Sequence, residues 1–99
     1  MENYILKDGV PVIEPDILVW AKWFETADRK VALTIVGDTK ISTVFLGKDH
    51  SFGHNDLPIL YETLVFGGKL DDEMERYTTI EEARLGHEIM VTRVRESQV

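Results

Sequence analysis

Residues 31–46 constrain the fold more than any other part of the sequence. They contain two runs rich in branched and aromatic residues, 31–36 and 40–46, with Gly37 and Asp38 between them. Such runs favour β-strands, and a short connection containing glycine joins two strands in antiparallel orientation. The sequence therefore predicts an antiparallel strand pair near the middle of the chain.

A second hairpin is predicted at the amino terminus. Two short apolar runs, 4–6 and 10–13, flank a turn that contains Asp8 and Gly9. Asp-Gly between β-forming residues is a strong turn signal, whereas Pro11 places the second strand at a sheet edge or makes it irregular.

Two more strands and two helices complete the prediction. Residues 58–66 form a strand that Gly67 and Gly68 end, and residues 73–77 form a short return strand. A helix is predicted over residues 15–28, where one arc gathers apolar side chains: Ile17, Trp20, Ala21, Trp23, Phe24 and Ala27. A second helix starts at Thr78, and its core-facing arc is Ile80, Ala83, His87, Met90, Val91 and Val94.

The start of the second helix carries a capping signal. Thr78 followed three residues later by Glu81 fits the capping box, in which the two side chains satisfy free backbone N–H groups at the helix start. The whole chain, residues 1–99, then reads as a single α+β domain. We expect an antiparallel sheet, made of the N-terminal hairpin and a β-meander, with both helices packed on one face. A domain of this size buries a modest core, so self-association into a homo-oligomer would add stability.

Charge and composition exclude several classes of function. The net charge is -7, which disfavours direct binding to nucleic acid. The chain has no cysteine and no long apolar run, so we expect neither a disulfide framework nor a membrane segment, and we expect a cytoplasmic location. The acidic cluster at residues 71–75 is typical of a solvated loop.

The loop KDHSFGHND, residues 48–56, offers metal-ligating side chains. Asp49, His50, His54 and Asp56 carry suitable atoms for zinc, manganese or iron. Their spacing matches neither a helical histidine pair nor a calcium loop, and glycine, asparagine and aspartate also suit a simple strand connection. We therefore predict no bound metal and no cofactor, with the loop mainly a turn.

His87 lies in the middle of the apolar arc of the last helix. Its position predicts a partly buried imidazole bonded to a backbone carbonyl or to a tyrosine such as Tyr77. The alternative is a ligand-contacting or titrating group at the edge of the cleft between helix and sheet. Leu85 and Ile89, on the other side of this helix, would suit a small subunit contact.

Aromatic and polar residues also suggest a small binding site. Aromatic faces combined with hydroxyls, an arginine and carboxylates are what a site uses to stack a base and to hold a ribose or a phosphate. The alternative is a core of aromatics beside solvent-facing strand positions. The predicted ligand-binding residues are Trp20, Arg29, Ser42, Asp49, His50, Phe52, Glu62 and His87. We assign no catalytic residue.

Motifs along nearly the whole chain resemble a family of short, uncharacterised proteins encoded by tailed phages and prophages. The motifs are WFETADR (23–29), STVFLG (42–47), DH (49–50), FG (52–53), ETLVFGG (62–68), RYTT (76–79), EEA (81–83) and GH (86–87). The relatives carry glycine and proline after the Phe-Gly pair, where this chain has His54 and Asn55. This departure makes His54 a poor candidate for an essential ligand, whereas Asp49 and His50 remain candidates.

The resemblance implies a function through binding. The leading hypothesis is a non-enzymatic phage accessory protein in the host cytoplasm that antagonises host defence by sequestering a small nucleotide-like ligand. In the leading hypothesis the partner is the nucleotide-like ligand or a host defence protein. Arg29 would pair with a phosphate, Trp20 or Phe52 would stack on the base, and Glu62 or Ser42 would bind the ribose.

Two alternatives belong to other classes. The first is an acidic inhibitor that binds a basic host nuclease or polymerase through residues 71–75. The other is a metal-dependent phosphohydrolase that uses Asp49, His50 and His87.

Overall fold

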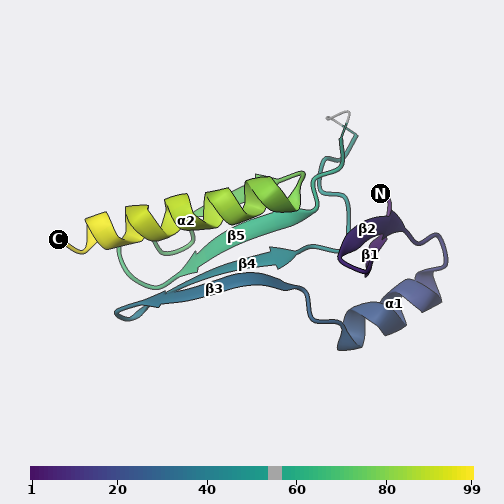
Figure 1. The fold of residues 1–99 in the computed structure, drawn as a ribbon, viewed down its shortest axis with the longest axis horizontal. Coiled ribbons are helices and arrows are strands. Elements are labelled where there is room, and N and C mark those ends of the chain that lie inside the picture. Colours follow the sequence, from purple (N-terminus) through teal and green to yellow (C-terminus); the bar gives the residue numbers. More distant parts are fainter. Residues whose placement is uncertain (54–56) are drawn as a thin grey trace.

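The fold is an antiparallel meander covered by one long helix, with a hairpin and a short helix at one end (Figure 1). The computed structural model describes residues 1–53 and 57–99. The elements are β1 (Tyr4–Lys7), β2 (Val10–Ile13), α1 (Ile17–Thr26), β3 (Lys30–Val36), β4 (Thr39–Phe45), β5 (Tyr61–Phe66), β6 (Met74–Tyr77) and α2 (Ile80–Ser97). The predicted α+β class, with its N-terminal hairpin and β-meander, is confirmed.

The strands form two separate sheets. β1 pairs with β2, and β3, β4, β5 and β6 pair in sequence order, all antiparallel. Asp8 and Gly9 turn the first hairpin with φ angles of 52° and 79°. Two consecutive residues in the left-handed region are what a tight hairpin turn of this kind requires, and Asp-Gly supplies them at low cost.

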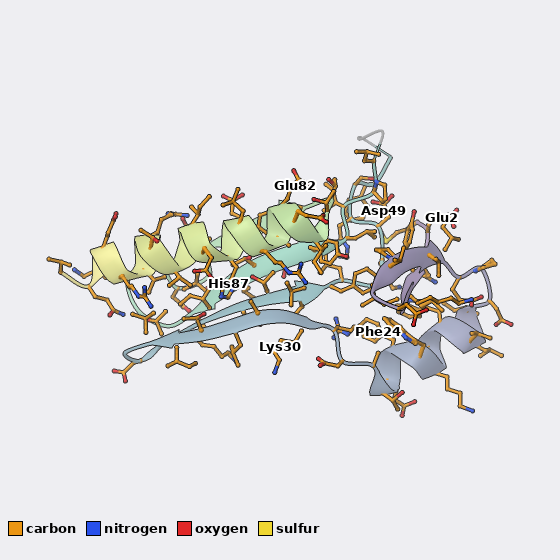
Figure 2. All side chains as sticks on the ribbon, viewed as in Figure 1. Glu2, Phe24, Lys30, Asp49, Glu82 and His87 are labelled. Atoms are coloured by element: carbon orange, nitrogen blue, oxygen red, sulfur yellow. The ribbon has the colours of Figure 1, made fainter. Side chains whose placement is uncertain are left out.

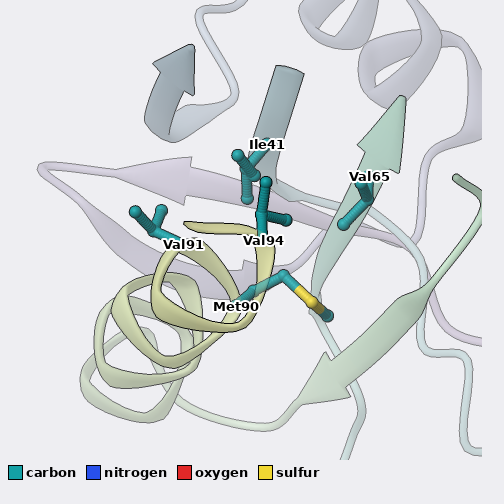
Figure 3. Close-up of a cluster of buried hydrophobic side chains, with 5 residues drawn as sticks. All are labelled: Ile41, Val65, Met90, Val91 and Val94. Carbon is teal, nitrogen blue, oxygen red and sulfur yellow. The ribbon is translucent and has the colours of Figure 1, made fainter. Parts of the chain in front are cut away.

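The core lies between α2 and the meander. One cluster of buried side chains joins the helix to the two central strands: Ile41, Val65, Met90, Val91 and Val94 (Figure 3). A second cluster, nearer the hairpin, consists of Phe45, Leu60, Tyr61 and Ala83. The predicted inward arc of the last helix is confirmed, because Ala83, His87, Met90, Val91 and Val94 are all buried.

The capping box of α2 lies one residue later than predicted. The Thr79 hydroxyl accepts a hydrogen bond from the Glu82 N–H, and the Glu82 carboxylate accepts one from the Thr79 N–H, both at 3.1 Å. Two threonines followed by two glutamates satisfy the pattern in either frame, so the sequence did not separate them. The Thr78 hydroxyl adds a hydrogen bond to the same carboxylate at 2.7 Å.

The position of α1 differs from our expectation of both helices on one face. α2 contacts every strand of the meander, whereas α1 contacts β1. The Trp20 indole N–H donates to the carbonyls of Tyr4 and Gly47, at 3.1 and 2.9 Å, and so fixes α1 to the hairpin end. Ile17, predicted to face the core, is 55 % exposed because the short hairpin covers only part of the helix. Figure 1 shows α1 beside the hairpin and away from α2.

Gly86, in the middle of α2, leaves space for the Tyr77 ring. A Cβ at position 86 would overlap the Tyr77 ring and hydroxyl. Glycine to alanine in a helix normally stabilises by about 1 kcal/mol, whereas overpacking costs about 1–3 kcal/mol. We expect Gly86→Ala to lower the free energy of unfolding by about 1–2 kcal/mol in urea titrations, because the steric term wins.

The matched control is the same substitution in a Tyr77→Ala background. There the overlap is gone, and Gly86→Ala should stabilise by up to about 1 kcal/mol. A substitution with the same sign in both backgrounds would contradict the steric explanation.

Candidate functional site

A chain of buried hydrogen bonds joins His87 on α2 to all four strands of the meander. The imidazole Nε2 lies 2.8 Å from the Thr34 hydroxyl on β3, and Nδ1 lies 2.7 Å from the Thr43 hydroxyl on β4. The Thr43 hydroxyl lies 2.5 Å from that of Thr63 on β5, which accepts from the Tyr77 hydroxyl on β6 at 3.0 Å. The prediction that His87 bonds to a backbone carbonyl or to a tyrosine such as Tyr77 is wrong. Both ring nitrogens contact threonine hydroxyls, and Thr43 and Thr63 connect the imidazole to Tyr77.

A neutral imidazole can satisfy every contact of this network. Tyr77 donates to Thr63. If Thr63 then donates to Thr43 and Thr43 to Nδ1, the ring proton is on Nε2 and donates to Thr34. Burial lowers the pKa of His87 below its ordinary 6.5, against a smaller opposite effect of Glu88. Both ring nitrogens of His87 have hydrogen-bond partners within the protein, so the imidazole has a structural role between α2 and the sheet.

The loop after β4 uses its predicted ligand residues to hold its own backbone. One Asp49 carboxylate oxygen accepts hydrogen bonds from the N–H groups of Ser51 and Ile59, at 2.8 and 3.0 Å. Burial alone would raise the Asp49 pKa, but these hydrogen bonds outweigh it and bring the pKa below 3.8. His50 donates from Nδ1 to the Lys48 carbonyl at 2.9 Å.

The metal interpretation of this loop gains no support. His54 and Asp56 lie outside the described residues, and among residues 1–53 and 57–99 no three histidine, aspartate or glutamate side chains are grouped to hold a metal ion. Figure 2 shows Asp49 near the hairpin end and His87 further along the long axis, between α2 and the sheet. With Asp49 and His87 at these separate places, the structure does not bring together the residues of the phosphohydrolase hypothesis.

Trp20 and Arg29 hold the junction between α1 and the sheet. Trp20 is buried, and its N–H is bonded to two carbonyls as described above. The Arg29 guanidinium donates to the Phe45 carbonyl at 2.9 Å and lies 4.0 Å from the centre of the Phe24 ring. Phe52, with a φ of 54°, is exposed in the loop. The polar groups of Trp20 and Arg29 therefore bond to backbone carbonyls of the chain itself.

Ser42 and Glu62 lie on the face of the meander opposite α2, which we call the uncovered face. Residues alternate between faces along a strand, and Thr43 and Thr63 point toward α2, so their neighbours Ser42 and Glu62 point away. Glu62 accepts a hydrogen bond from Arg76 at 3.0 Å. By the same alternation and register, the other members of this face are Leu33, Ile35, Lys40, Val44, Leu64, Phe66, Met74 and Arg76.

The uncovered face is unusually apolar for a face that no element of the described chain covers. The covered face holds apolar side chains of both core clusters together with the three threonines of the His87 network. The uncovered face also exposes large apolar side chains: Leu33 (48 %), Ile35 (62 %), Phe66 (41 %) and Met74 (45 %). The solvated face of an antiparallel sheet is normally polar, so these four side chains stand out.

Two surface hollows in the described part of the chain are further candidate sites. One of about 300 Å³ lies between β6 and α2 and is lined by Tyr77, Gly86, Ile89, Met90, Glu75 and Arg93. Arg93 is paired with Glu73 at 2.6 Å, so its charge is already neutralised. The other, of about 370 Å³, lies between the hairpin turn and the start of α2, and its lining includes Pro11, Tyr61 and Thr79. None of the eight predicted ligand-binding residues lines either hollow.

Comparison of the chain with known protein families, with curated proteins and with solved structures found no match. The resemblance to short tailed-phage proteins therefore stays a prediction. Within the described residues, no helix combines the length and the apolar character needed to cross a membrane.

The buried imidazole predicts a pH dependence of stability. Because the pKa of His87 is lowered in the folded state, the unfolded chain takes up the proton first as the pH falls below 6.5. We expect the free energy of unfolding to fall between about pH 7.5 and pH 5.5, with a contribution from this one group of at most about 1.4 kcal/mol per pH unit.

Urea titrations of wild type and His87→Gln across this range measure the effect. His87→Gln should show a smaller slope with pH, whereas Thr34→Val, which removes one hydrogen-bond partner but keeps the imidazole, should retain most of the slope. Equal slopes for wild type and His87→Gln would show that His87 is not the group responsible.

Proposed function

We propose that this chain is a non-enzymatic binding protein whose uncovered face is its binding surface, and that the partner is a protein. The observation that carries the proposal is the apolar character of the uncovered face. Leu33, Ile35 and Phe66 are exposed there, and so is Met74 on the edge strand β6. Exposed apolar side chains stabilise the folded chain little, but they contribute substantially once a partner removes them from water.

The uncovered face mixes apolar and polar side chains, as many protein interfaces do. Large apolar side chains on β3, β5 and β6 flank Ser42 and Lys40 on the central strand β4, and the Glu62–Arg76 pair lies at one end of the face. A protein interface needs no cavity, whereas small-molecule sites are concave. The lining residues of the two hollows do not include this face, which favours a macromolecular partner.

The resemblance to tailed-phage proteins gives the proposal its biological setting. In that setting the partner is a host defence protein, and binding blocks its action. The acidic segment 71–75 leads into β6 and includes its first two residues. A partner with a basic patch beside its apolar contact surface would be attracted to this segment. Part of this charge is used internally, since Glu73 pairs with Arg93 and Asp71 accepts from the Gly67 N–H at 2.6 Å.

A second candidate is the sequestering of a nucleotide-like ligand on the same face. Ser42 and Glu62 share this face with the exposed Phe66 ring, and the Lys40 ammonium lies 4.5 Å from the centre of that ring. An aromatic ring beside a cation, a hydroxyl and a carboxylate is a combination that can stack a base and hold a sugar phosphate. Phe66 and Lys40 would then replace Trp20 and Arg29 in the roles first predicted.

Plating assays test the protein-binding proposal. Phage plating is measured on bacteria that carry single defence systems and express the wild-type chain or the double variant Phe66→Ser/Met74→Ser. We expect the wild-type chain to restore plating and the double variant to lose at least about tenfold of that effect, because truncated interface anchors commonly cost more than 1 kcal/mol. The control is Leu85→Ser on the outer side of α2, where the leucine is 64 % exposed.

Both variants should unfold within about 1 kcal/mol of wild type, since the altered side chains are exposed. Antagonism that survives Phe66→Ser/Met74→Ser would refute the uncovered face as the binding surface. Thermal melts of the purified chain with linear and cyclic nucleotides test the second candidate. A raised melting temperature that Ser42→Ala and Glu62→Gln abolish would replace the protein partner with a nucleotide.

A further inference from the structure

The two edges of the meander differ in length and in protection. β3 and β6 are the outer strands, so each has one side without a neighbouring strand in the described part of the chain. β3 has seven residues, with its only charge at Lys30, whereas β6 has four residues, of which Glu75 and Arg76 are charged. A long, apolar edge strand is a template for pairing with another chain, and proteins usually blunt such edges with charge or short length.

We propose that two copies of this chain pair through β3 in antiparallel orientation, centred on Thr34, to form one continuous eight-stranded sheet. A two-fold axis perpendicular to the sheet relates the copies, as in other isologous dimers. The axis places Leu33 of one copy opposite Ile35 of the other, Ala32 opposite Val36, and the two Thr34 residues opposite each other. Every cross-strand pair is then apolar with apolar or threonine with threonine, and such pairs stabilise a sheet.

The hydrogen-bond phase of β3 fits the same register. Val36 and Thr39 close the two-residue turn to β4 and therefore form a hydrogen-bonded pair. Bonded and non-bonded pairs alternate, so Thr34 bonds to β4, while Leu33 and Ile35 direct their N–H and C=O groups to the free edge. In the Thr34-centred register, these outward groups of Leu33 meet those of Ile35 from the second copy.

The opposite edge is less suited to an equivalent pairing. With α2 of both copies on the same side, the registers that align most of β6 place Glu75 or Arg76 opposite its own copy. Like charges directly opposite each other destabilise a sheet, and the acidic residues 71–73 add repulsion. The β3 pairing avoids this, because the register irregularity between Lys30 and Ala32 ends the regular edge before the lysine.

The inference does not depend on the proposed function, since it uses the edge of the sheet and not its face. Its consequence is that the two uncovered faces adjoin on one side of the dimer, while the two α2 helices lie on the other side. Strand pairing buries less area than a standard interface, so association in the micromolar range is expected. With a net charge of -7 on each copy, added salt should strengthen the dimer by screening repulsion.

Sedimentation velocity over roughly 5–500 µM protein tests the proposal, because an interface of this size falls in that range of affinity. We expect a concentration-dependent dimer that Ile35→Lys weakens at least about 100-fold, because a lysine on an edge strand opposes pairing. The control is Ile89→Lys on α2, which introduces the same charge at a site of similar exposure, 54 % against 62 %, and should leave the dimer intact. A monomer throughout the range, or a dimer disrupted by Ile89→Lys and not by Ile35→Lys, would overturn the proposal.

Cysteine cross-linking tests the register, because the chain has no cysteine of its own. Thr34→Cys should form an intermolecular disulfide under mild oxidation, since directly opposite non-bonded residues have Cα atoms about 4.5 Å apart. Leu33→Cys should cross-link poorly, because its copy lies diagonally at about 7–8 Å. Efficient cross-linking of Leu33→Cys in place of Thr34→Cys would overturn the Thr34-centred register. Loss of the dimer in Phe66→Ser/Met74→Ser alone would indicate stacking of uncovered faces and overturn the edge pairing.

Discussion

The hydrogen-bond chain through His87 determines how the rest of the molecule is arranged. One residue from each strand of the meander takes part: Thr34, Thr43, Thr63 and Tyr77. A buried polar group is costly unless all its partners are present, and within the described residues no buried side-chain polar atom lacks one. The network therefore specifies the position of α2 along the sheet more precisely than the aliphatic contacts of Ile41, Val65 and Met90 alone would.

The meander carries large apolar side chains on both of its faces. Ile41 and Val65 pack against α2 beside the threonines, and Leu33, Phe66 and Met74 lie on the uncovered face. Burying a large apolar side chain stabilises by about 1.5–3 kcal/mol, and the chain alone leaves much of this unrealised on its uncovered face. A partner that covers this face gains that contribution, which is the physical basis of the proposed binding function.

Local sequence patterns predicted the helices and strands well. The features that the sequence did not predict depend on contacts between residues far apart in the chain. Helical periodicity placed His87 inward, and Asp-Gly placed the first hairpin, because both depend on neighbours in sequence. The position of α1 depends on a hydrogen bond from Trp20 to Gly47, 27 residues away, which periodicity cannot reveal. Asp49 and His50 looked like ligands because the side chains that bind metals also stabilise turns, and only the geometry shows that they bond to the backbone of their own loop.

The difference between the two edges of the sheet bears on both proposals, the binding by the uncovered face and the pairing through β3. Charges and short length protect β6, whereas β3 offers a self-complementary apolar edge, so the proposed extension of the sheet is at β3. Extension at β3 places the two uncovered faces side by side in a rigid sheet. A partner that is itself two-fold symmetric could then occupy both faces at once, and the second contact would form at a high effective concentration. Because His87 bonds to Thr34, the residue on the proposed two-fold axis, the interaction that positions α2 also orders the strand through which the sheet would extend.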